Sequence, residues 1–494
     1  MAAGHASHLS RAEGTAMAWG KAVGVASWVE RLKANDASLT SVTVFRGRLF
    51  GPDEAAAVSA ALRTNTHLLE LYASGHAMDA ATTATLAEAL ATNATLQSLC
   101  VGDDAFGDAG LAALAPGVAK STSLRSLDLE NKGVGDAGAA ALGDALATAR
   151  SGGCPSLNAI NLSRNAALTP EGVAAVCAGA KNVTNLQKLI LRDLDASGVA
   201  ADAVAELVAS ARRLAVLDLS RATLDVAAGD VAKIRVGLDR RFEKDAAPLA
   251  LELDGIALGD GGAVALAGEI APGGASRFVA RLSVRGCAVG ADGAGALARA
   301  YGGSTETLVL RENALGDAGA RAVAAALASN ETSRLSRLDL GCNGVGAGGA
   351  AAVARSARGV SDLSLFGNAS MGNEGLTLFT ADDVETQSAL ACLRSLDLGG
   401  CGADEAGLVA FADSLAGDAN RLPRLETLVV GGNPGTQGDA WEPALARLRE
   451  SRPGLDVAWR AADAGENPET EEMRANLLAG ARTENGNGTA RAMF

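Results

Sequence analysis

Histidine and aromatic residues are scarce in this sequence of 494 residues, and their scarcity excludes several kinds of site. Only four histidines occur, and residues 77–494 contain none. Because histidine is the usual base of catalytic triads and a frequent zinc ligand, such sites are excluded from most of the chain. We expect a protein that is not an enzyme and that holds no metal ion or cofactor. With aromatic residues at 3%, the core has to consist of Leu, Val and Ala.

Paired cysteines and long apolar segments are also missing. The seven cysteines form no CxxC pair, which is typical of free thiols in a reducing compartment. The opening residues MAAGHASHLSRAEG lack the apolar region of a signal peptide, and Lys21 interrupts the apolar stretch that follows. We therefore expect a cytoplasmic protein without membrane contact, with the nucleus, the cytoskeleton and cilia as further locations to consider.

Phosphate-binding features are weak as well. The formal net charge of −14 argues against a nucleic-acid partner and favours a basic one. The stretch LAPGVAKST lacks the glycines of a P-loop. Two GxGxxG matches, from Gly133 and from Gly344, fall in a slot that recurs along the chain, so we attribute them to a structural repeat instead of a dinucleotide site.

The sequence does contain a repeat of the form LxxLxLxxNxL, numbered here from its first Leu. Leu124, Leu127 and Leu129 occupy positions 1, 4 and 6 of one copy. Fourteen copies share one phase, at an average spacing of about 30 residues. These units 1 to 14 start at Leu39, Leu68, Leu96, Leu124, Leu157, Leu186, Leu214, Pro248, Val279, Thr305, Leu335, Val360, Leu393 and Leu425.

Each unit predicts a short strand, a turn and a helix. Alternating Leu at positions 4 and 6 is typical of a strand whose positions 3, 5 and 7 point outward. Segments such as GDAG at 107–110 and GADG at 290–293 then precede Ala-rich stretches, and their Asp is expected to cap the helix that it begins. Because such crossovers are right-handed, we predict an α/β fold, a right-handed solenoid or horseshoe with parallel strands inside and helices outside.

The ends and one insertion depart from the repeat. Residues 1–38 form an N-terminal segment in which 16–34 predict an amphipathic capping helix. The solenoid is expected over 39–459, including a terminal half-repeat with Leu455, Val457 and Trp459. Residues 460–494 are polar and aperiodic, and we expect most of them to be disordered. The insertion at 225–247 fits either a longer helix or an exposed loop.

Position 9 of the unit calls for Asn, whose side chain can bond main-chain groups of adjacent units. Five units have it, at Asn165, Asn313, Asn343, Asn368 and Asn433. Elsewhere the slot holds other residues, among them Lys132, Cys287 and Cys401, so we expect an incomplete ladder and less regular turns there.

The predicted concave face combines an acidic row with an arginine column. Keeping a large sheet soluble would be one role of these charges; docking a protein partner would be another. From unit 11 onward the same columns are mostly Gly, so we expect few side-chain contacts there. The candidate protein-binding residues are Phe45, Arg46, Tyr72, Asp128, Arg164, Arg192, Asp218, Arg221, Glu252, Arg285, Arg311 and Asp339.

The unit length, the LxxLxLxxN core and the GDxGA helix start resemble the ribonuclease-inhibitor-like class of leucine-rich repeats over about residues 39–459. That class includes ribonuclease inhibitors, NOD-like receptor sensor regions and Ran GTPase-activating proteins. The resemblance implies a monomeric, non-catalytic scaffold that binds another protein. The alternative that it implies is a GTPase-activating protein for a small, Ran-like GTPase.

Overall fold

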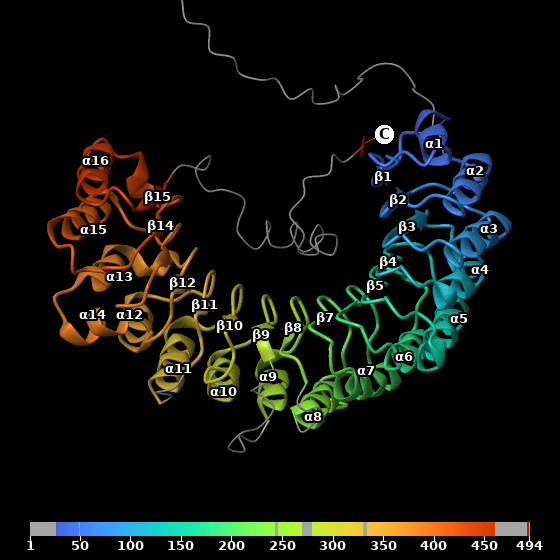
Figure 1. The fold of residues 1–494 in the computed structure, drawn as a ribbon. Coiled ribbons are helices and arrows are strands. Elements are labelled where there is room, and N and C mark those ends of the chain that lie inside the picture. Colours follow the sequence, from blue (N-terminus) through green and yellow to red (C-terminus); the bar gives the residue numbers. More distant parts are fainter. Residues whose placement is uncertain are drawn as a thin grey trace, which may run out of the picture.

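The chain forms a horseshoe with strands along its inner side and helices along its outer side (Figure 1). This computed structural model describes residues 26–48, 50–242, 246–268, 279–329, 333–459 and 492–493. Strands β1 to β15 alternate with helices and lie parallel in one sheet, each beside its neighbours in the sequence. The predicted α/β horseshoe is therefore confirmed.

The strands are three to five residues long, apart from a two-residue strand near the C-terminus. They are β1 Ser41–Thr43, β2 Glu70–Ser74, β3 Ser98–Gly102, β4 Ser126–Asp128, β5 Ala159–Asn161, β6 Lys188–Ile190, β7 Val216–Asp218, β8 Leu249–Glu252, β9 Val279–Ser283, β10 Thr307–Val309, β11 Arg337–Asp339, β12 Asp362–Ser364, β13 Ser395–Asp397, β14 Thr427–Val429, β15 Asp456–Ala458 and β16 Ala492–Met493. Strand β16 pairs in parallel with β1.

The helices follow the strands and are supplemented by short 3-10 turns. The helices are α1 Ala26–Lys33, α2 Pro52–Leu62, α3 Ala80–Leu90, α4 Gly107–Lys120, α5 Asp136–Ala147, α6 Pro170–Ala180, α7 Val199–Ser210, α8 Asp230–Phe242, α9 Gly259–Ala267, α10 Ala291–Tyr301, α11 Gly316–Ala328, α12 Ala347–Ser356, α13 Gly372–Thr377, α14 Val384–Ala389, α15 Glu405–Gly417 and α16 Trp441–Ser451. The 3-10 turns are η1 Thr148–Ser151, η3 Ala369–Met371, η4 Leu378–Thr380 and η5 Pro434–Gln437.

The strands coincide with the repeat units. In unit 4, for example, β4 covers positions 3 to 5, and Leu127 lies in register with Ile160 of β5. Leu124, Leu127 and Leu129 are each at most 1% exposed, so positions 1, 4 and 6 build the core. Small residues let the helices pack closely behind it: a Cβ atom on Gly143 would lie 2.5 Å from the carbonyl oxygen of Ala175 in the next helix.

The Asp of the GDxG segment caps the next helix, and the prediction that it caps its own helix is wrong for these units. Asp108, in the first turn of α4, accepts hydrogen bonds from the amides of Gly135 (2.7 Å) and Gly138 (2.8 Å) at the start of α5. Asp260 accepts in the same way from Gly290 and Gly293, both at 2.8 Å. These carboxylates therefore join consecutive units as well as satisfying open helix amides.

Position 9 forms a more continuous ladder than the sequence predicts. The Asn165 amide donates to the carbonyl of Leu129 in the preceding unit (2.9 Å) and accepts from the Val134 amide (3.0 Å). Where Asn is missing, thiols supply the donor: Cys287 Sγ donates to Leu253 (3.1 Å) and Cys401 Sγ to Leu365 (3.2 Å). The expected irregularity is wrong at these two positions, because a buried thiol replaces the amide hydrogen bond.

Aromatic side chains close both ends of the described solenoid. Trp28 of α1 is 1% exposed and stacks on Phe50, with ring centroids 6.3 Å apart. At the other end Trp441 meets Trp459 edge to face at 6.3 Å. Residues 16–25 of the predicted capping helix lie outside the described residues, as does the tail from 460 on, apart from β16.

The insertion at 225–247 contains a helix of ordinary length, since α8 has 13 residues, as α11 does. Helix α8 spans Asp230–Phe242, and Arg241 near its end is 1% exposed. Its guanidinium donates to several carbonyls, including those of Leu214 (2.7 Å) and Ala247 (2.8 Å). The buried arginine thus fixes the end of this helix against the neighbouring unit.

Candidate functional site

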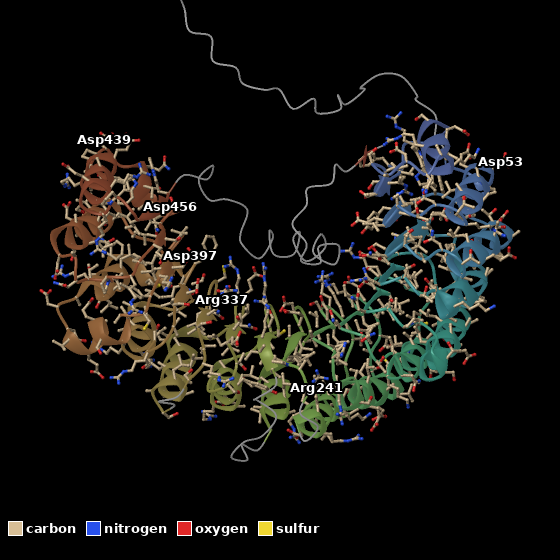
Figure 2. All side chains as sticks on the ribbon, viewed as in Figure 1. Asp53, Arg241, Arg337, Asp397, Asp439 and Asp456 are labelled. Atoms are coloured by element: carbon tan, nitrogen blue, oxygen red, sulfur yellow. The ribbon has the colours of Figure 1, made fainter. Side chains whose placement is uncertain are left out.

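The predicted site residues lie in rows along the concave face of the sheet. Figure 2 shows the side chains of Arg337 and Asp397 on the inner side of the horseshoe and that of Asp53 on the outer side. The strand register aligns position 5 of successive units, because the residue at position 5 of each strand pairs with the residue at position 5 of the adjacent strand. The row from unit 2 to unit 8 is Tyr72, Cys100, Asp128, Asn161, Ile190, Asp218 and Glu252.

Several acidic side chains of this row bond the backbone two residues further on. Asp128 accepts from the Glu130 amide (3.0 Å), and Asp339 accepts from the Gly341 amide (2.8 Å). Asp218 accepts from the Ser220 amide at 3.0 Å. Position 5 therefore ends the strand by satisfying the amide of position 7, a local side-chain turn typical of Asp and Asn. This is a structural role that sequence reasoning missed.

The acidic row is also much less exposed than expected. Asp218 is 2% exposed, and the side chains of Glu252 and Asp339 are each 16% exposed. Burial raises the pKa of Glu252 to about 7 and raises the pKa values of Asp128 and Asp339. The row lies on the concave face as expected, but Asp218, Glu252 and Asp339 are largely covered, because Arg192, Arg281 and Arg311 respectively lie beside them.

The predicted arginines of the middle units pair with carboxylates of adjacent units. Arg192 donates to the buried Asp218, with 2.5 Å between Nε and Oδ2. Arg221 forms two hydrogen bonds with Asp193 (2.6 and 2.7 Å), whose pKa these bonds lower. Arg164 pairs with Glu130 and Asp193, and Arg285 pairs with Glu312. Arg281, which was not among the predicted residues, pairs with Glu252.

Sequence reasoning missed Asp193 and Glu312 as the partners of these arginines. Both stand at position 8, and they lie 28 residues from Arg221 and 27 residues from Arg285 respectively. The signal that could have found them is an acidic residue about one repeat away from an arginine, in the same column for Arg221 and in the adjacent column for Arg285.

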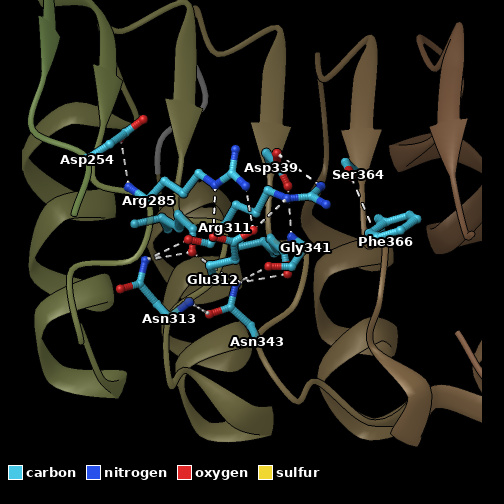
Figure 3. A network of polar contacts seen from close by, with 12 residues as sticks. Asp254, Arg285, Arg311, Glu312, Asn313, Asp339, Gly341, Asn343, Ser364 and Phe366 are labelled. Atoms are coloured by element: carbon cyan, nitrogen blue, oxygen red, sulfur yellow. Dashed lines mark hydrogen bonds and ion pairs between the residues drawn. The ribbon is translucent and has the colours of Figure 1, made fainter. Parts of the chain in front are cut away.

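Further along the face, Arg311 lies across three units (Figure 3). Its guanidinium sits 4.7 Å from the centroid of the Phe366 ring and 3.9 Å from the carboxylate of Asp339. A Cβ atom on Gly341 would lie 2.9 Å from the Arg311 guanidinium. The glycine columns of the later units therefore leave room for large side chains that lie flat on the sheet.

The first units present a different surface. Phe45, two residues after the end of β1, is 48% exposed, and the next residue, Arg46, is exposed as well. Beside them a hollow of about 510 Å³ opens over units 1 to 5, lined among others by Arg46, Tyr72, Asp103, Asp104 and Lys132. Lys132 is 2% exposed and donates to Ser74 Oγ (2.5 Å) and to the Gly102 carbonyl (2.9 Å). Phe45, Arg46 and Tyr72 are thus brought to one end of the face, away from the central arginines.

The cysteine thiols named below and His76 are buried and take part in the packing of the solenoid. Burial raises the pKa of Cys100, Cys177, Cys287 and Cys401 to about 12, so these thiols stay protonated at neutral pH. His76 is buried, with its ring Nε2 3.3 Å from the Val44 carbonyl. Within the described ranges no three His, Cys, Asp or Glu side chains are grouped as metal ligands would be. No helix in that part of the chain is long and apolar enough to cross a membrane.

Comparison with known proteins identifies the repeat. A family described as "Leucine Rich repeat" matches residues 120–143, 153–177, 306–324 and 335–354. No curated protein matches the chain. These four segments, together with the strand and helix units around them, make the chain a leucine-rich repeat protein.

Three solved structures are similar to this chain at low identity. An internalin from Listeria monocytogenes is 15% identical, with 89% of each chain covered and a TM-score of 0.40. The yeast complex of Rad7 and Elc1 gives 15% identity, covers 84% of this chain and 94% of that chain, and has a TM-score of 0.37. The complex of TLR13 with ssRNA13 gives 14%, covers 86% of this chain and 54% of that chain, and has a TM-score of 0.45.

Proposed function

We propose that this chain is a non-catalytic scaffold that binds another protein through the concave face of its horseshoe. The observation that carries the proposal is the continuous inner sheet, on which one row of residues runs in register through fourteen units. A curved surface of this kind can wrap a partner along many units, and it presents the aromatic and arginine side chains that dominate binding energies.

The proposal extends to finer features of the chain. We assign it to the ribonuclease-inhibitor-like subclass, because most units carry a full helix, such as the 14 residues of α4 and the 13 of α11. We also propose one solenoid domain over 39–459, a monomer in solution and a cytoplasmic location.

Site-specific crosslinking tests which face binds. A photo-reactive amino acid placed at Ile190, at position 5 of the concave row, should capture a discrete partner from a lysate of the source cells. The matched control replaces Val199 on the outer side, which is 51% exposed in the first turn of α7. Capture from Val199 but not from Ile190 would place the interface on the helices and refute the proposal.

A biochemical assay separates the scaffold from the alternative of a GTPase activator. The scaffold proposal predicts that Ran and other small GTPases hydrolyse GTP at their intrinsic rates when catalytic amounts of the full chain are added. A stimulation that is lost after substitution of concave-face residues would favour the activator instead.

A further inference from the structure

The concave face divides into a region of paired charges and a region of unpaired ones. In the middle units, arginines such as Arg192 and Arg221 are bonded to carboxylates of adjacent units. In units 1 to 3, by contrast, the charged side chains of Arg46, Asp103 and Asp104 form no ion pair within the described part of the chain. Unpaired groups at one end of an otherwise neutralised surface remain available to a partner.

The hollow in these units has a simple structural origin. Position 7 holds a large side chain in several later units, such as Arg192 and Arg285, but it is Ser74 in unit 2 and Gly102 in unit 3. Gly102 has a φ of +84°, which favours glycine, and its carbonyl accepts from the Lys132 ammonium. The missing side chains leave a hollow of about 510 Å³, within the roughly 300–1,000 Å³ of ligand pockets.

The charges around the hollow favour a positively charged occupant. Lys132 is bonded to Ser74 and Gly102, and Arg164 to Glu130 and Asp193, so two of the three cations in the wall are already engaged. The stem of Arg46 lies over Gly75, where a Cβ atom would be 3.2 Å from it. Asp104 is exposed at the rim, and the Asp103 carboxylate there accepts a hydrogen bond from the Ala105 amide (3.1 Å).

An exposed aromatic ring beside the hollow supplies a second, independent feature. Phe45 precedes Arg46 in the sequence and is 48% exposed, and it is the one aromatic side chain among the large exposed hydrophobic residues of the described chain. An exposed aromatic ring next in sequence to an exposed arginine is typical of protein interfaces, in which aromatic residues and Arg are enriched.

We propose that units 1 to 4 bind a segment of a protein partner, with a Lys or Arg side chain of that segment entering the hollow beside Asp103 and Asp104. An apolar residue next to that basic side chain packs on Phe45. The inference rests on the proposed function, because it takes concave-face binding as given and assigns its location and chemistry. The net charge of −14 adds long-range attraction for such a segment.

A peptide selection tests the proposal with a defined probe. Random 12-residue peptides displayed on phage are selected against the full chain, and the enriched peptides are synthesised and titrated. We expect Arg or Lys next to an aromatic or aliphatic residue, and binding weakened about tenfold by the double substitution Asp103→Asn and Asp104→Asn. Phe45→Ser should weaken binding similarly. The matched control is Asp53→Asn with Asp439→Asn, which removes the same charge from the exposed outer surface.

The outcomes are distinguishable. Enriched peptides without a basic residue, equal losses in the two double variants, or no enriched peptide would each overturn the proposal. Peptides whose affinity does not change with the Asp103 and Asp104 substitutions but falls for the Arg221→Gln or Arg285→Gln variant would overturn the proposal for units 1 to 4. The scaffold function would stand. Both proposals would be overturned by peptides whose affinity is unchanged by every concave-face substitution but is weakened by substitutions of Val199 or Val264 on the outer helices.

Discussion

Asp108 lies in the first turn of α4, yet its carboxylate is 2.7 Å from the amide nitrogen of Gly135, where the helix of the next unit begins. The bond spans 27 residues of sequence and only one step of the solenoid. Its neighbour Gly138 has no room for a side chain, because a Cβ atom there would lie 2.7 Å from the same carboxylate. The GDxG segment is therefore a joint between two units, with the Asp from one and the Gly from the other.

Replacement of Asp108 by Ala should destabilise the chain by about 0.5–2 kcal/mol, the usual cost of a lost helix cap. Chemical denaturation followed by circular dichroism measures it. Asp144→Ala on the outer face of α5 is the control, since Asp144 is exposed, and it should change stability by no more than about 0.5 kcal/mol. Equal effects of the two substitutions would show that the bond between units contributes nothing.

Core truncation tests the phase of the repeat. Leu338 of β11 is 1% exposed, so Leu338→Ala should cost about 2–5 kcal/mol through the cavity it leaves. Leu338→Asp should cost more, because it buries a charge without a partner. The control Val384→Ala affects a side chain that is 83% exposed and should be nearly neutral in thermal melts. A Leu338→Asp variant with the wild-type melting temperature would contradict the phase.

The stability of the chain should depend on the protonation of Glu252. Burial raises the pKa of this carboxyl to about 7 in the folded chain, so folding favours its protonated form. That contribution is complete below the unfolded pKa of about 4.3 and is lost as the pH rises through 7. Relative to a Glu252→Gln variant, the wild-type chain should therefore lose on the order of 2–3 kcal/mol between pH 5 and pH 8.

Glu312 provides the control of opposite sign. Hydrogen bonding to Arg285 lowers the pKa of Glu312, so its contribution is present above the unfolded pKa and is lost as the pH falls through the lowered value. Denaturant titrations of wild type, Glu252→Gln and Glu312→Gln measure both effects when they extend from pH 8 to well below the unfolded Glu pKa of about 4.3. A Glu252→Gln difference that is flat from pH 5 to pH 8 would be inconsistent with the buried carboxyl.

Reversal of the Arg192 charge should damage the fold. Its partner Asp218 has a side chain only 3% exposed, so Arg192→Glu would place two carboxylates together in a largely buried site. We expect a loss on the order of 3 kcal/mol in equilibrium unfolding. Arg355→Glu is the control: its pair with Asp383 is exposed (51% and 42%), so this substitution should change stability far less than Arg192→Glu. Equal losses in the free energy of unfolding of the two variants would show that the Arg192 pair contributes no more than an exposed surface pair.

Truncation after residue 459 tests the expectation for the tail. Because residues 460–494 have no periodic apolar face, we expect the truncated chain to keep the circular dichroism spectrum and melting temperature of the full chain. A fall of many degrees in the melting temperature would show that the tail packs on the solenoid, for which β16 beside β1 marks one place to look.

The architecture could be predicted because the repeat is periodic. Apolar residues stand at positions 4 and 6 of every unit, as Leu127 and Leu129 do in unit 4. Because the period is fixed, the pattern determines which side chains face inward. Contacts between units could not be predicted in this way. Whether Arg221 meets Asp193 or Asp218 depends on how far one unit is shifted and turned against the next, and the linear pattern carries no such distances.

The candidate site was predicted in part for the same reason. Phe45, Arg46 and Tyr72 are expected on the concave face because of their positions in the unit. The hollow depends in addition on the Lys132 side chain, which bonds the Gly102 carbonyl of unit 3. Lys132 occupies position 9 in place of Asn, and nothing in the sequence indicates that its long side chain reaches the Ser74 hydroxyl, two repeats earlier.

The joint between Asp108 and Gly135 also bears on how such a chain can change length. A complete unit cut out or duplicated at this joint brings an Asp and a Gly of the same kind back together, as Asp260 and Gly290 already meet further along. A deletion of half a unit would leave one carboxylate without its amides and one helix start without its cap. Gain and loss of whole repeats is therefore the structurally tolerated route by which a gene of this type lengthens or shortens its binding surface.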